Sequence, residues 1–523
     1  MRQKRGVDMT RGPIMRQVAL FALPLCLGSI LQLLYSTVDS IVIGNFCGAS
    51  SLAAVGTSSQ PIEVFMCLFM GVSSGITILV SQAVGKGDAA RQRQLAVNTV
   101  FFLYLCALPV TLAGLVCGPL LLRLMAVPED AFARAAGYIR IVFLGTLGNL
   151  GYNLNAGLLR GLGDSRATLR FLVISCAVNI ALDLLFVALF RWDVTGAAAA
   201  TAAAMYVSWL CSVAYLRRRY PELGFRLLPN GHDWSAVRDM ARIGLPLALN
   251  HSVFSLGHMA MQTFVNMQGS AFMAACAIGS KINGFTSVTV NAFASATTSF
   301  AGQNLGAARY DRLSRGGRII PLVNGGVGLA FGLLFMAFCR PLVSLFTRDP
   351  EVLAQGAAFV RAVLPFIWSF AVYNSVMSFS NGIGKVRYPM IVTILMLWAV
   401  RIPSAWLINR FWDGHMIIHC HALSFMFGML AMLPFYLTKP WRDIREKGRA
   451  LGNALIDARR SPRAFFGSSC FPVGLQLLQS RFACQLPQRG SLAAAKRHAI
   501  ASLPEGGGSA QPRRKESASH NYP

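Results

Sequence analysis

The sequence SQAVGKGDAAR at residues 81–91 recurs as GQNLGAARYDR at residues 302–312, about 221 residues later. The aligned positions include two glutamines and two glycines, Gln82 with Gln303 and Gly85 with Gly306. Three further pairs of segments match, and all four pairs have the same order in both halves of the chain. They are FALPL (21–25) with IGLPL (243–247), LLRGLGDSR (158–166) with SFSNGIGKVRYP (378–389), and AVNIALD (177–183) with AVRIPSA (399–405). Ordered matches at nearly one offset indicate that the chain contains two copies of one unit.

Long apolar runs separate these motifs. The chain has 523 residues, of which 54% are hydrophobic and 13% charged, whereas a soluble domain is about 25% charged. Runs of 18 or more apolar residues can span a bilayer as helices, so the composition excludes a soluble enzyme and a disordered chain. We predict twelve transmembrane helices, with approximate limits 17–43, 52–84, 97–122, 137–159, 169–190, 195–216, 241–266, 274–303, 318–339, 360–383, 389–410 and 416–437.

The charge distribution predicts how the chain crosses the membrane. The net charge is +27, but the basic residues cluster in short loops between apolar runs, which is typical of a membrane protein and not of a nucleic-acid binder. Arg160, Arg166 and Arg170 are assigned to one such cytoplasmic loop. With both termini cytoplasmic, the loops alternate between basic and less basic, as a multi-pass protein of the cell (plasma) membrane requires. The scattered cysteines show no disulfide or metal-ligand spacing.

Six helices per copy give both copies the same orientation in the membrane. Parallel repeats of this kind enclose a central cavity between two lobes that can rock against each other. We therefore predict an all-α transporter and not an enzyme. Its expected parts are an N-terminal lobe (1–216), a cytoplasmic linker (217–240), a C-terminal lobe (241–450) and a cytoplasmic tail (451–523) that we expect to be disordered.

Three acidic residues, Asp39, Glu63 and Asp183, lie within predicted spans. A charge at membrane depth costs at least about 2.5–3.5 kcal/mol on insertion scales, so such residues usually face a cavity and have a function. Asp39 and Asp183 have similar depths, and Asn179 shares a helical face with Asp183 because it lies four residues earlier. With Thr201, they could bind a proton or a small hard cation. The role of Glu63 stays open.

The duplication places this expected ion site in one lobe. Asp39, Asn179 and Asp183 align with Met261, Arg401 and Ala405. The predicted spans of the second copy contain no Asp or Glu. Ion coupling is therefore expected in the N-terminal lobe.

The motifs together resemble the multidrug and toxic compound extrusion (MATE) family, over residues 12–450. The resemblance rests on LPLCLGSILQLLYSTVDSIVIG (23–44), SQAVGKGD, LLRGLGDSR, AGQNLGAA and VRIP, and it looks most like the branch named for a DNA-damage-inducible protein. It implies two six-helix lobes and antiport of organic cations or drugs against protons or sodium. Asp39, Asn179, Asp183 and Thr201 match the N-lobe ion site of that branch.

The resemblance also implies a substrate site. Gln32, Tyr35, Tyr138 and Asn153 are expected to line the N-lobe cavity, where aromatic faces suit organic cations. The expected partners are small organic cations or drugs and membrane lipids, with no nucleic acid and a monomeric chain. We expect no cofactor beyond the coupling ion, a proton or Na⁺. No metal site is expected at His415, His419 and His421, because no further ligand completes that set except Asp413.

Two other functions remain open at this point. A lipid-linked oligosaccharide flippase can share the two-lobe architecture, although it would carry charges throughout its cavity. A membrane-embedded transferase would need a polar catalytic cluster at one membrane face, and the sequence shows no His/Asp pair or metal set for it. The sequence does not name the substrate or decide between proton and sodium.

Overall fold

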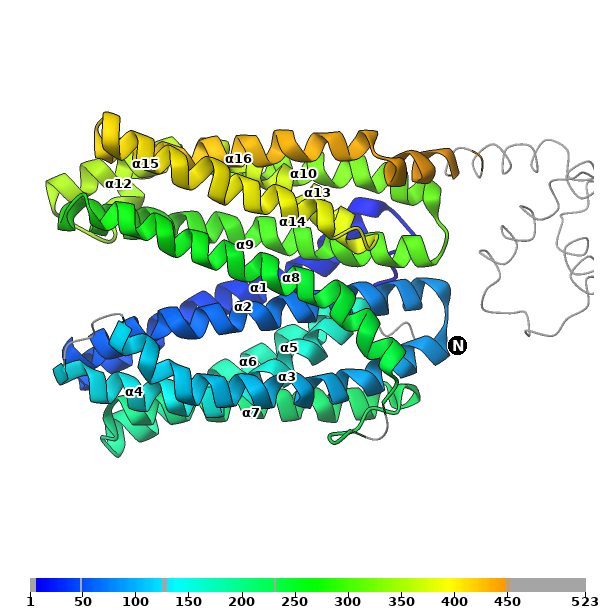
Figure 1. Ribbon diagram of the computed structural model, residues 1–523, viewed down its shortest axis with the longest axis horizontal. Coiled ribbons are helices and arrows are strands. Elements are labelled where there is room, and N and C mark those ends of the chain that lie inside the picture. Colours follow the sequence, from blue (N-terminus) through cyan, green and yellow to red (C-terminus); the bar gives the residue numbers. More distant parts are fainter. Residues whose placement is uncertain (1–5, 48, 125–128, 230–231, 448–449, 451–523) are drawn as a thin grey trace, which may run out of the picture. The chain divides into compact units, whose positions relative to one another are not determined.

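The computed structural model describes residues 6–47, 49–124, 129–229, 232–447 and 450, and these residues form helices joined by short turns (Figure 1). The first half contains α1 (Ile14–Phe46), α2 (Ala49–Lys86), α3 (Ala89–Leu124), α4 (Glu129–Leu144), α5 (Thr146–Gly161), α6 (Ser165–Asp183), the π-helical turn η1 (Leu184–Leu189) and α7 (Asp193–Arg219). The expected tail, 451–523, lies outside the described residues.

The second half repeats this order after the short η2 (Pro221–Leu223). It contains α8 (Trp234–Asn266), α9 (Ser270–Gly306), α10 (Tyr310–Ala337), α11 (Cys339–Ser344), α12 (Pro350–Val363), η3 (Leu364–Phe366), α13 (Ile367–Gly382), α14 (Arg387–Ile394), η4 (Leu395–Arg401), α15 (Ile402–Phe411), η5 (Gly414–Ile418), α16 (His419–Met432) and η6 (Leu433–Leu437). In Figure 1 the first-half helices form the lower bundle and the second-half helices the upper one.

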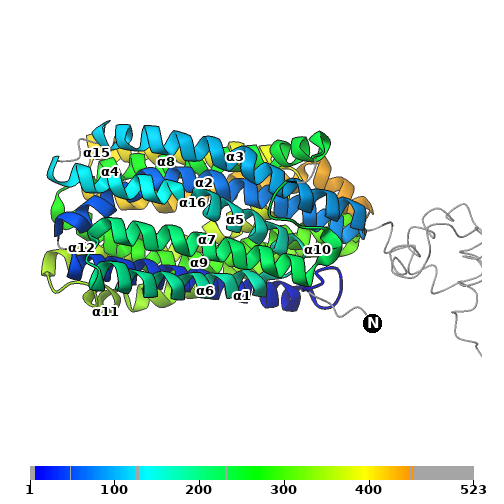
Figure 2. The same ribbon diagram turned by 90° about the horizontal axis from the view of Figure 1, so that it is seen from below.

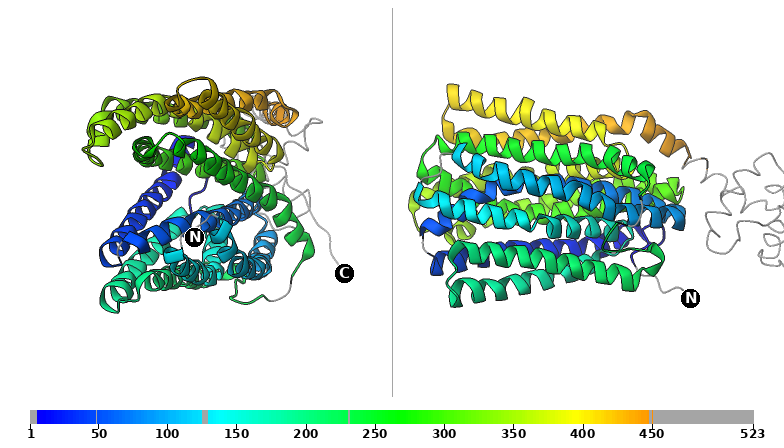
Figure 3. Two further views of the ribbon diagram at one scale, coloured as in Figure 1. Left: turned by 60° about the vertical axis from the view of Figure 1, so that its left-hand side comes forward. Right: turned by 60° about the horizontal axis from the view of Figure 1, so that its bottom comes forward.

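Several of the predicted spans consist of consecutive short helices. The predicted span 137–159 is interrupted at Gly145, between α4 and α5, and the span 360–383 contains the 3₁₀ turn η3 with its proline at the second position. Two others widen into π-helical turns, η1 after α6 and η4 before α15. When the consecutive short helices of one predicted span are counted together as one rod, the described helices confirm the predicted all-α plan of two six-helix lobes. Figures 2 and 3 show these rods running side by side along one axis.

The rods differ in how apolar they are. By length and composition, eight helical stretches of the described residues could cross a membrane, and α2, α4–α5, α8 and α9 are not among them. Three of these, α2, α8 and α9, pack against each other between the two halves. Contact with another helix instead of lipid removes the need for apolar side chains, so these helices can carry small and polar residues.

The repeated sequence motifs meet each other at one end of the bundle. Gly85 and Gly306 sit so close to the opposite half that a Cβ at Gly85 would lie 2.0 Å from the Gln303 carbonyl oxygen, and one at Gly306 would lie 2.1 Å from the Gln82 carbonyl oxygen. Only glycine permits this approach. The two copies therefore touch through the same motif, each against its counterpart.

Reciprocal hydrogen bonds join the halves at this end. Gln82 Nε2 donates to the Gly382 carbonyl oxygen at 3.0 Å, and Gln303 Nε2 donates to the Gly161 carbonyl oxygen at 3.3 Å. The N-terminal segment is bound there too, because the Met9 N–H donates to Gln303 Oε1 at 3.0 Å. We call this region, defined by Gln82, Gly161, Gln303 and Gly382, the closed end.

Candidate functional site

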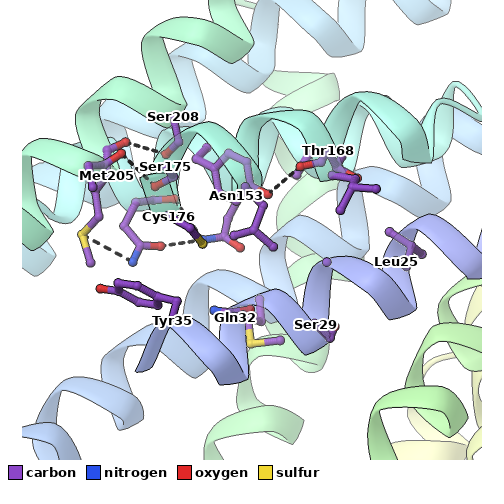
Figure 4. A pocket seen from close by; sticks show the side chains of 18 of the residues that line it. Leu25, Ser29, Gln32, Tyr35, Asn153, Thr168, Ser175, Cys176, Met205 and Ser208 are labelled. Atoms are coloured by element: carbon purple, nitrogen blue, oxygen red, sulfur yellow. Dashed lines mark hydrogen bonds between the residues drawn. The ribbon is translucent and has the colours of Figure 1, made fainter. Parts of the chain in front are cut away.

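A cavity of about 440 Å³ lies between α1, α5, α6 and α7 of the first half and reaches α2 and α9. Figure 4 shows Leu25, Ser29, Gln32 and Tyr35 on α1, on the side of the cavity opposite Ser175 and Cys176 of α6. Pro24 lies inside α1 beside this wall. Because proline removes one helical hydrogen bond, α1 can bend at this position and change the width of the cavity.

The lining combines uncharged polar groups with thioethers and aromatic rings. The Asn153 Nδ2 group donates to Asn149 Oδ1 at 2.6 Å, and the Tyr152 hydroxyl donates to the Thr168 carbonyl oxygen at 3.4 Å. Met205 also lines the cavity. Thioethers adapt to ligands of different shape and aromatic faces attract organic cations, so this wall suits flat, mostly apolar molecules.

Arg160 is the single charged residue among the described residues that line the cavity. Its Nη2 donates to Ser73 Oγ at 2.9 Å, and its carbonyl oxygen accepts from Ser299 Oγ in the second half at 3.3 Å. The assignment of Arg160 to a loop is wrong, because α5 continues to Gly161. Side chains on a helix point toward its N-terminus, so the last turn of α5 directs Arg160 back into the bundle.

The two acidic residues lie behind the cavity wall. Asp39 on α1 and Asp183 at the end of α6 lie next to each other, and neither lines the cavity. Asp183 is only 1% exposed, and one carboxyl oxygen of each residue is buried without a partner among the described residues. A hydrogen bond between two carboxyl groups requires a proton on one of them. Two adjacent carboxyl groups can therefore hydrogen-bond to each other when one of them is protonated.

Asn179 and Thr201 connect this pair to the cavity. With its amide nitrogen turned toward the carboxylate, Asn179 donates to Asp183 Oδ2 at 2.8 Å and its amide oxygen faces Thr201. The Thr201 hydroxyl is also a hydrogen-bonding neighbour of Tyr35. Asn179, Thr201 and Tyr35 line the cavity, so one continuous polar network runs from the cavity surface to the buried acids.

The local backbone helps to place Asp183. The α-helix α6 ends at this residue and the π-helical turn η1 begins at the next. Such wide turns are rare and occur frequently at functional sites, because they change which side chains face inward. The widened turn thus marks the point where the first half holds its buried acid.

The structure brings together Asp39, Asn179, Asp183 and Thr201, and it places Gln32, Tyr35 and Asn153 in the cavity lining. Tyr138 differs from its expected place. It is 8% exposed, packs with Val142, Val194 and Ala198, and does not line the cavity. It belongs to α4, which lies against α2, α3 and α7, so its ring fills the space behind the wall.

Other candidate residues lie apart from this network. Glu63 is exposed on α2 and does not line the cavity. His415 Nδ1 contacts Asp413 Oδ1 at 2.8 Å, and His419 Nδ1 contacts the Met416 carbonyl oxygen at 3.1 Å. Within the part of the chain that the structure describes, no group of three or more His, Cys, Asp or Glu could hold a metal ion.

Sequence reasoning missed Arg160 and Tyr152 as cavity residues. For Arg160 a signal was available, because LLRGLGDSR keeps its apolar run up to the arginine and places the first glycine after it. The helix could therefore have been extended to include Arg160. Tyr152 carries no distinguishing signal, since aromatic residues in membrane helices are common at any depth.

Comparison with known proteins agrees with the duplication. The family model MatE matches residues 24–185 and again 246–407. Among curated relatives, the probable multidrug resistance protein YpnP of Bacillus subtilis is 27% identical over 84% of this chain and 99% of its own length. The probable multidrug resistance protein NorM of Thermotoga maritima is 24% identical, over 84% of this chain and 96% of its own.

A solved structure described as MATE in the bent conformation superposes with a TM-score of 0.78 at 22% identity, covering 85% of this chain and 99% of the other. At this identity the likeness concerns the fold alone. The family model, however, covers more than half of the chain in two copies. The chain therefore belongs to the MATE family, whose members are membrane transporters and not enzymes.

Proposed function

We propose that this protein exports organic cations or drugs across the cell membrane in antiport with protons, by alternating access. The observation that carries the proposal is the Asp39–Asp183 pair, connected by Asn179 and Thr201 to the wall of a cavity that suits organic molecules. The relatives named as probable multidrug resistance proteins support the choice of substrate class.

A proton is favoured over sodium by the contact between the two carboxyl groups. A bound sodium ion is ligated by several oxygens and would lie between the carboxylates. A shared proton instead would join the two groups directly, and the adjacent placement of the two carboxyl groups supports this choice. The pair would then take up and release protons as a unit.

Protonation would change the distance between α1 and α6. With one shared proton, Asp39 and Asp183 hold the two helices together. Without it, two negative charges within a few ångströms repel each other strongly in a low-dielectric setting. Because Pro24 allows α1 to bend, proton binding would draw the α1 wall toward α6 and α7 and expel the substrate.

The arrangement of the halves supports an outward-open state. Hydrogen bonds between the halves concentrate at the closed end, among Gln82, Gln303 and their glycine carbonyl partners. The positive-inside distribution of loop charges supports a cytoplasmic position for this end. In this state the substrate would leave outward, and the closed end would open to let the next molecule in.

The experiment uses the full chain in proteoliposomes loaded with ethidium, with a proton gradient or a sodium gradient applied separately. We expect proton-driven transport in the wild type and its loss in Asp39→Asn, which keeps the shape but cannot share the proton. Glu63→Gln is the matched control, because this acid is exposed and lies outside the cavity lining. Full proton-driven transport by Asp39→Asn would refute the mechanism, and transport driven by sodium alone would replace the proton.

A further inference from the structure

The second half contains a buried arginine that pairs with no acidic residue among the described residues. Arg401 ends the π-helical turn η4, in the middle of the α14–η4–α15 rod, and is only 2% exposed. Its Nε donates to Ser424 Oγ of α16 at 2.8 Å, and its guanidinium carbon lies 5.3 Å from the centre of the Phe425 ring. A guanidinium keeps its charge in proteins, so this site holds a permanent positive charge inside the bundle.

The hydrogen bonding of Arg401 is incomplete. Its Nη2 group is buried and has no hydrogen-bond partner among the described residues. The described acids of the second half lie at or near helix ends, in the turns between rods or in the helical segment after η6; they are Asp233, Asp239, Asp311, Asp349, Glu351, Asp413, Asp443 and Glu446. A buried charge without a counter-charge is strongly destabilising, and an unfilled donor adds to that cost. The site therefore lacks one negatively charged hydrogen-bond acceptor.

The surroundings of Arg401 consist of neutral side chains, with Cys420 and Tyr373 as further electrostatic neighbours, and contain no anionic acceptor among the described residues. His258 of α8 and His421 of α16 are electrostatic neighbours of the guanidinium. The Ser424 hydroxyl is already used, because it accepts from Arg401 and donates to the His421 carbonyl oxygen at 2.8 Å. Imidazole N–H groups and an unpaired guanidinium N–H group match an anion, whereas a metal ion would need acceptors.

The duplication makes the contrast between the halves explicit. Arg401 occupies the position of Asn179, and Ala405 that of Asp183. Both positions adjoin a π-helical turn, η1 after Asp183 and η4 ending at Arg401. A π-helical turn thus follows the buried acid in the first half and ends at the guanidinium in the second, at positions that the repeat does not align.

We propose that the Arg401 site, made of Arg401, Ser424, His258 and His421, binds one monovalent inorganic anion, chloride in the cell, as a resident ligand of the second half. A halide carries a single charge, accepts hydrogen bonds from any direction and needs little room. These properties fit a guanidinium group that lies between α8, η4 and α16 and has one N–H donor without an acceptor.

The first test locates the anion directly. The wild-type protein is crystallised with bromide replacing chloride, and anomalous scattering from bromine is measured. We expect a peak within contact distance of Arg401 Nη2. The absence of a peak at Arg401 in crystals that show bromide elsewhere would overturn the proposal.

The second test measures thermal stability of the purified full chain in sodium chloride, sodium gluconate and sodium acetate at equal ionic strength. A ligand that binds only the folded state raises Tm, and we expect about 5 °C at saturating chloride over gluconate. Arg401→Gln should abolish the chloride-dependent rise, whereas Arg410→Gln, an exposed arginine on the same rod, should keep it.

The outcomes of the second test separate halide binding at Arg401 from a general effect of salt on stability. An equal rise in Arg401→Gln, no rise in the wild type, or a rise with acetate and none with chloride would each refute a halide at this site. If Arg401→Gln does not fold, the bromide experiment on the wild type decides the question. Neither test depends on transport, so the proposal can fail while the proposed function stands.

Discussion

Replacing Gln303 with alanine should loosen the closed end without affecting either half by itself. Gln303 is 2% exposed, donates to the Gly161 carbonyl oxygen and accepts from the Met9 N–H. The substitution removes both bonds between segments that come together only when this end is closed. At a net value of about 1 kcal/mol per bond, the loss is about 2 kcal/mol. Since 1.4 kcal/mol corresponds to a factor of ten, opening should become about 30-fold more frequent.

Hydrogen exchange followed by mass spectrometry can measure this opening on the protein in nanodiscs. The Val7 N–H donates to the Gly163 carbonyl oxygen at 2.9 Å, so its exchange reports separation of the N-terminal segment from the first half. We expect exchange at Val7 to accelerate about 30-fold in Gln303→Ala. The control is Gln92→Ala, which loses a side-chain bond to the Ala83 carbonyl oxygen within the first half.

Unchanged exchange at Val7 in Gln303→Ala would refute the role assigned to the closed end. The same would follow if Gln92→Ala accelerated exchange equally, because the effect would then not depend on bonds between the halves. A reciprocal variant, Gln82→Ala, removes the bond to the Gly382 carbonyl oxygen. Its effect should be smaller than that of Gln303→Ala, since only one bond is lost.

Two predictions concern stability near the end of α7. Asp164→Ala should lower the free energy of unfolding by about 3 kcal/mol, because the carboxylate caps α6 at the Ala167 N–H and accepts from the hydroxyls of Tyr215 at 2.8 Å and Tyr220 at 3.1 Å. The Tm of this variant is compared with that of Asp349→Ala, which removes an exposed cap of α12. Equal losses in the two variants would contradict the prediction. Burial, reinforced by the neighbouring Asp164 carboxylate, raises the pKa of the Tyr220 phenol above its ordinary value of 10.0. Its neutral form therefore contributes stability that is fully present below about pH 10 and is lost as the pH rises further. Tyr220→Phe should consequently lose less Tm between pH 9 and 11 than the wild type, and an identical loss in both proteins would contradict this.

The sequence predicted the number of helical rods better than it predicted their internal breaks. Each rod follows an apolar run, and apolar length depends on local composition alone. The interruption at Gly145 and the π-helical turns η1 and η4 carry no comparable pattern. Their geometry depends on how neighbouring rods pack and on which backbone groups find partners.

The sequence predicted the site residues whose side chains are rare inside membrane helices, and it did not distinguish those whose side chains are common there. Carboxylates at membrane depth are costly, so Asp39 and Asp183 were found from the sequence. Tyr138 and Tyr152 could not be distinguished by the same reasoning, because a ring packs equally well behind a wall or in it. The structure places Tyr152 in the cavity lining and Tyr138 behind it.

The sequence by itself determined that the chain is duplicated, that each copy has six membrane rods, and that buried acids occur in the first copy only. These features follow from residue order and from the cost of placing charge in lipid, which act locally. Only the tertiary structure decided that Gln82 and Gln303 bond across the halves, that Arg160 turns into the cavity, and that Arg401 lacks a counter-charge among the described residues. Each of these depends on distances between residues far apart in the chain, which packing sets and no local pattern encodes.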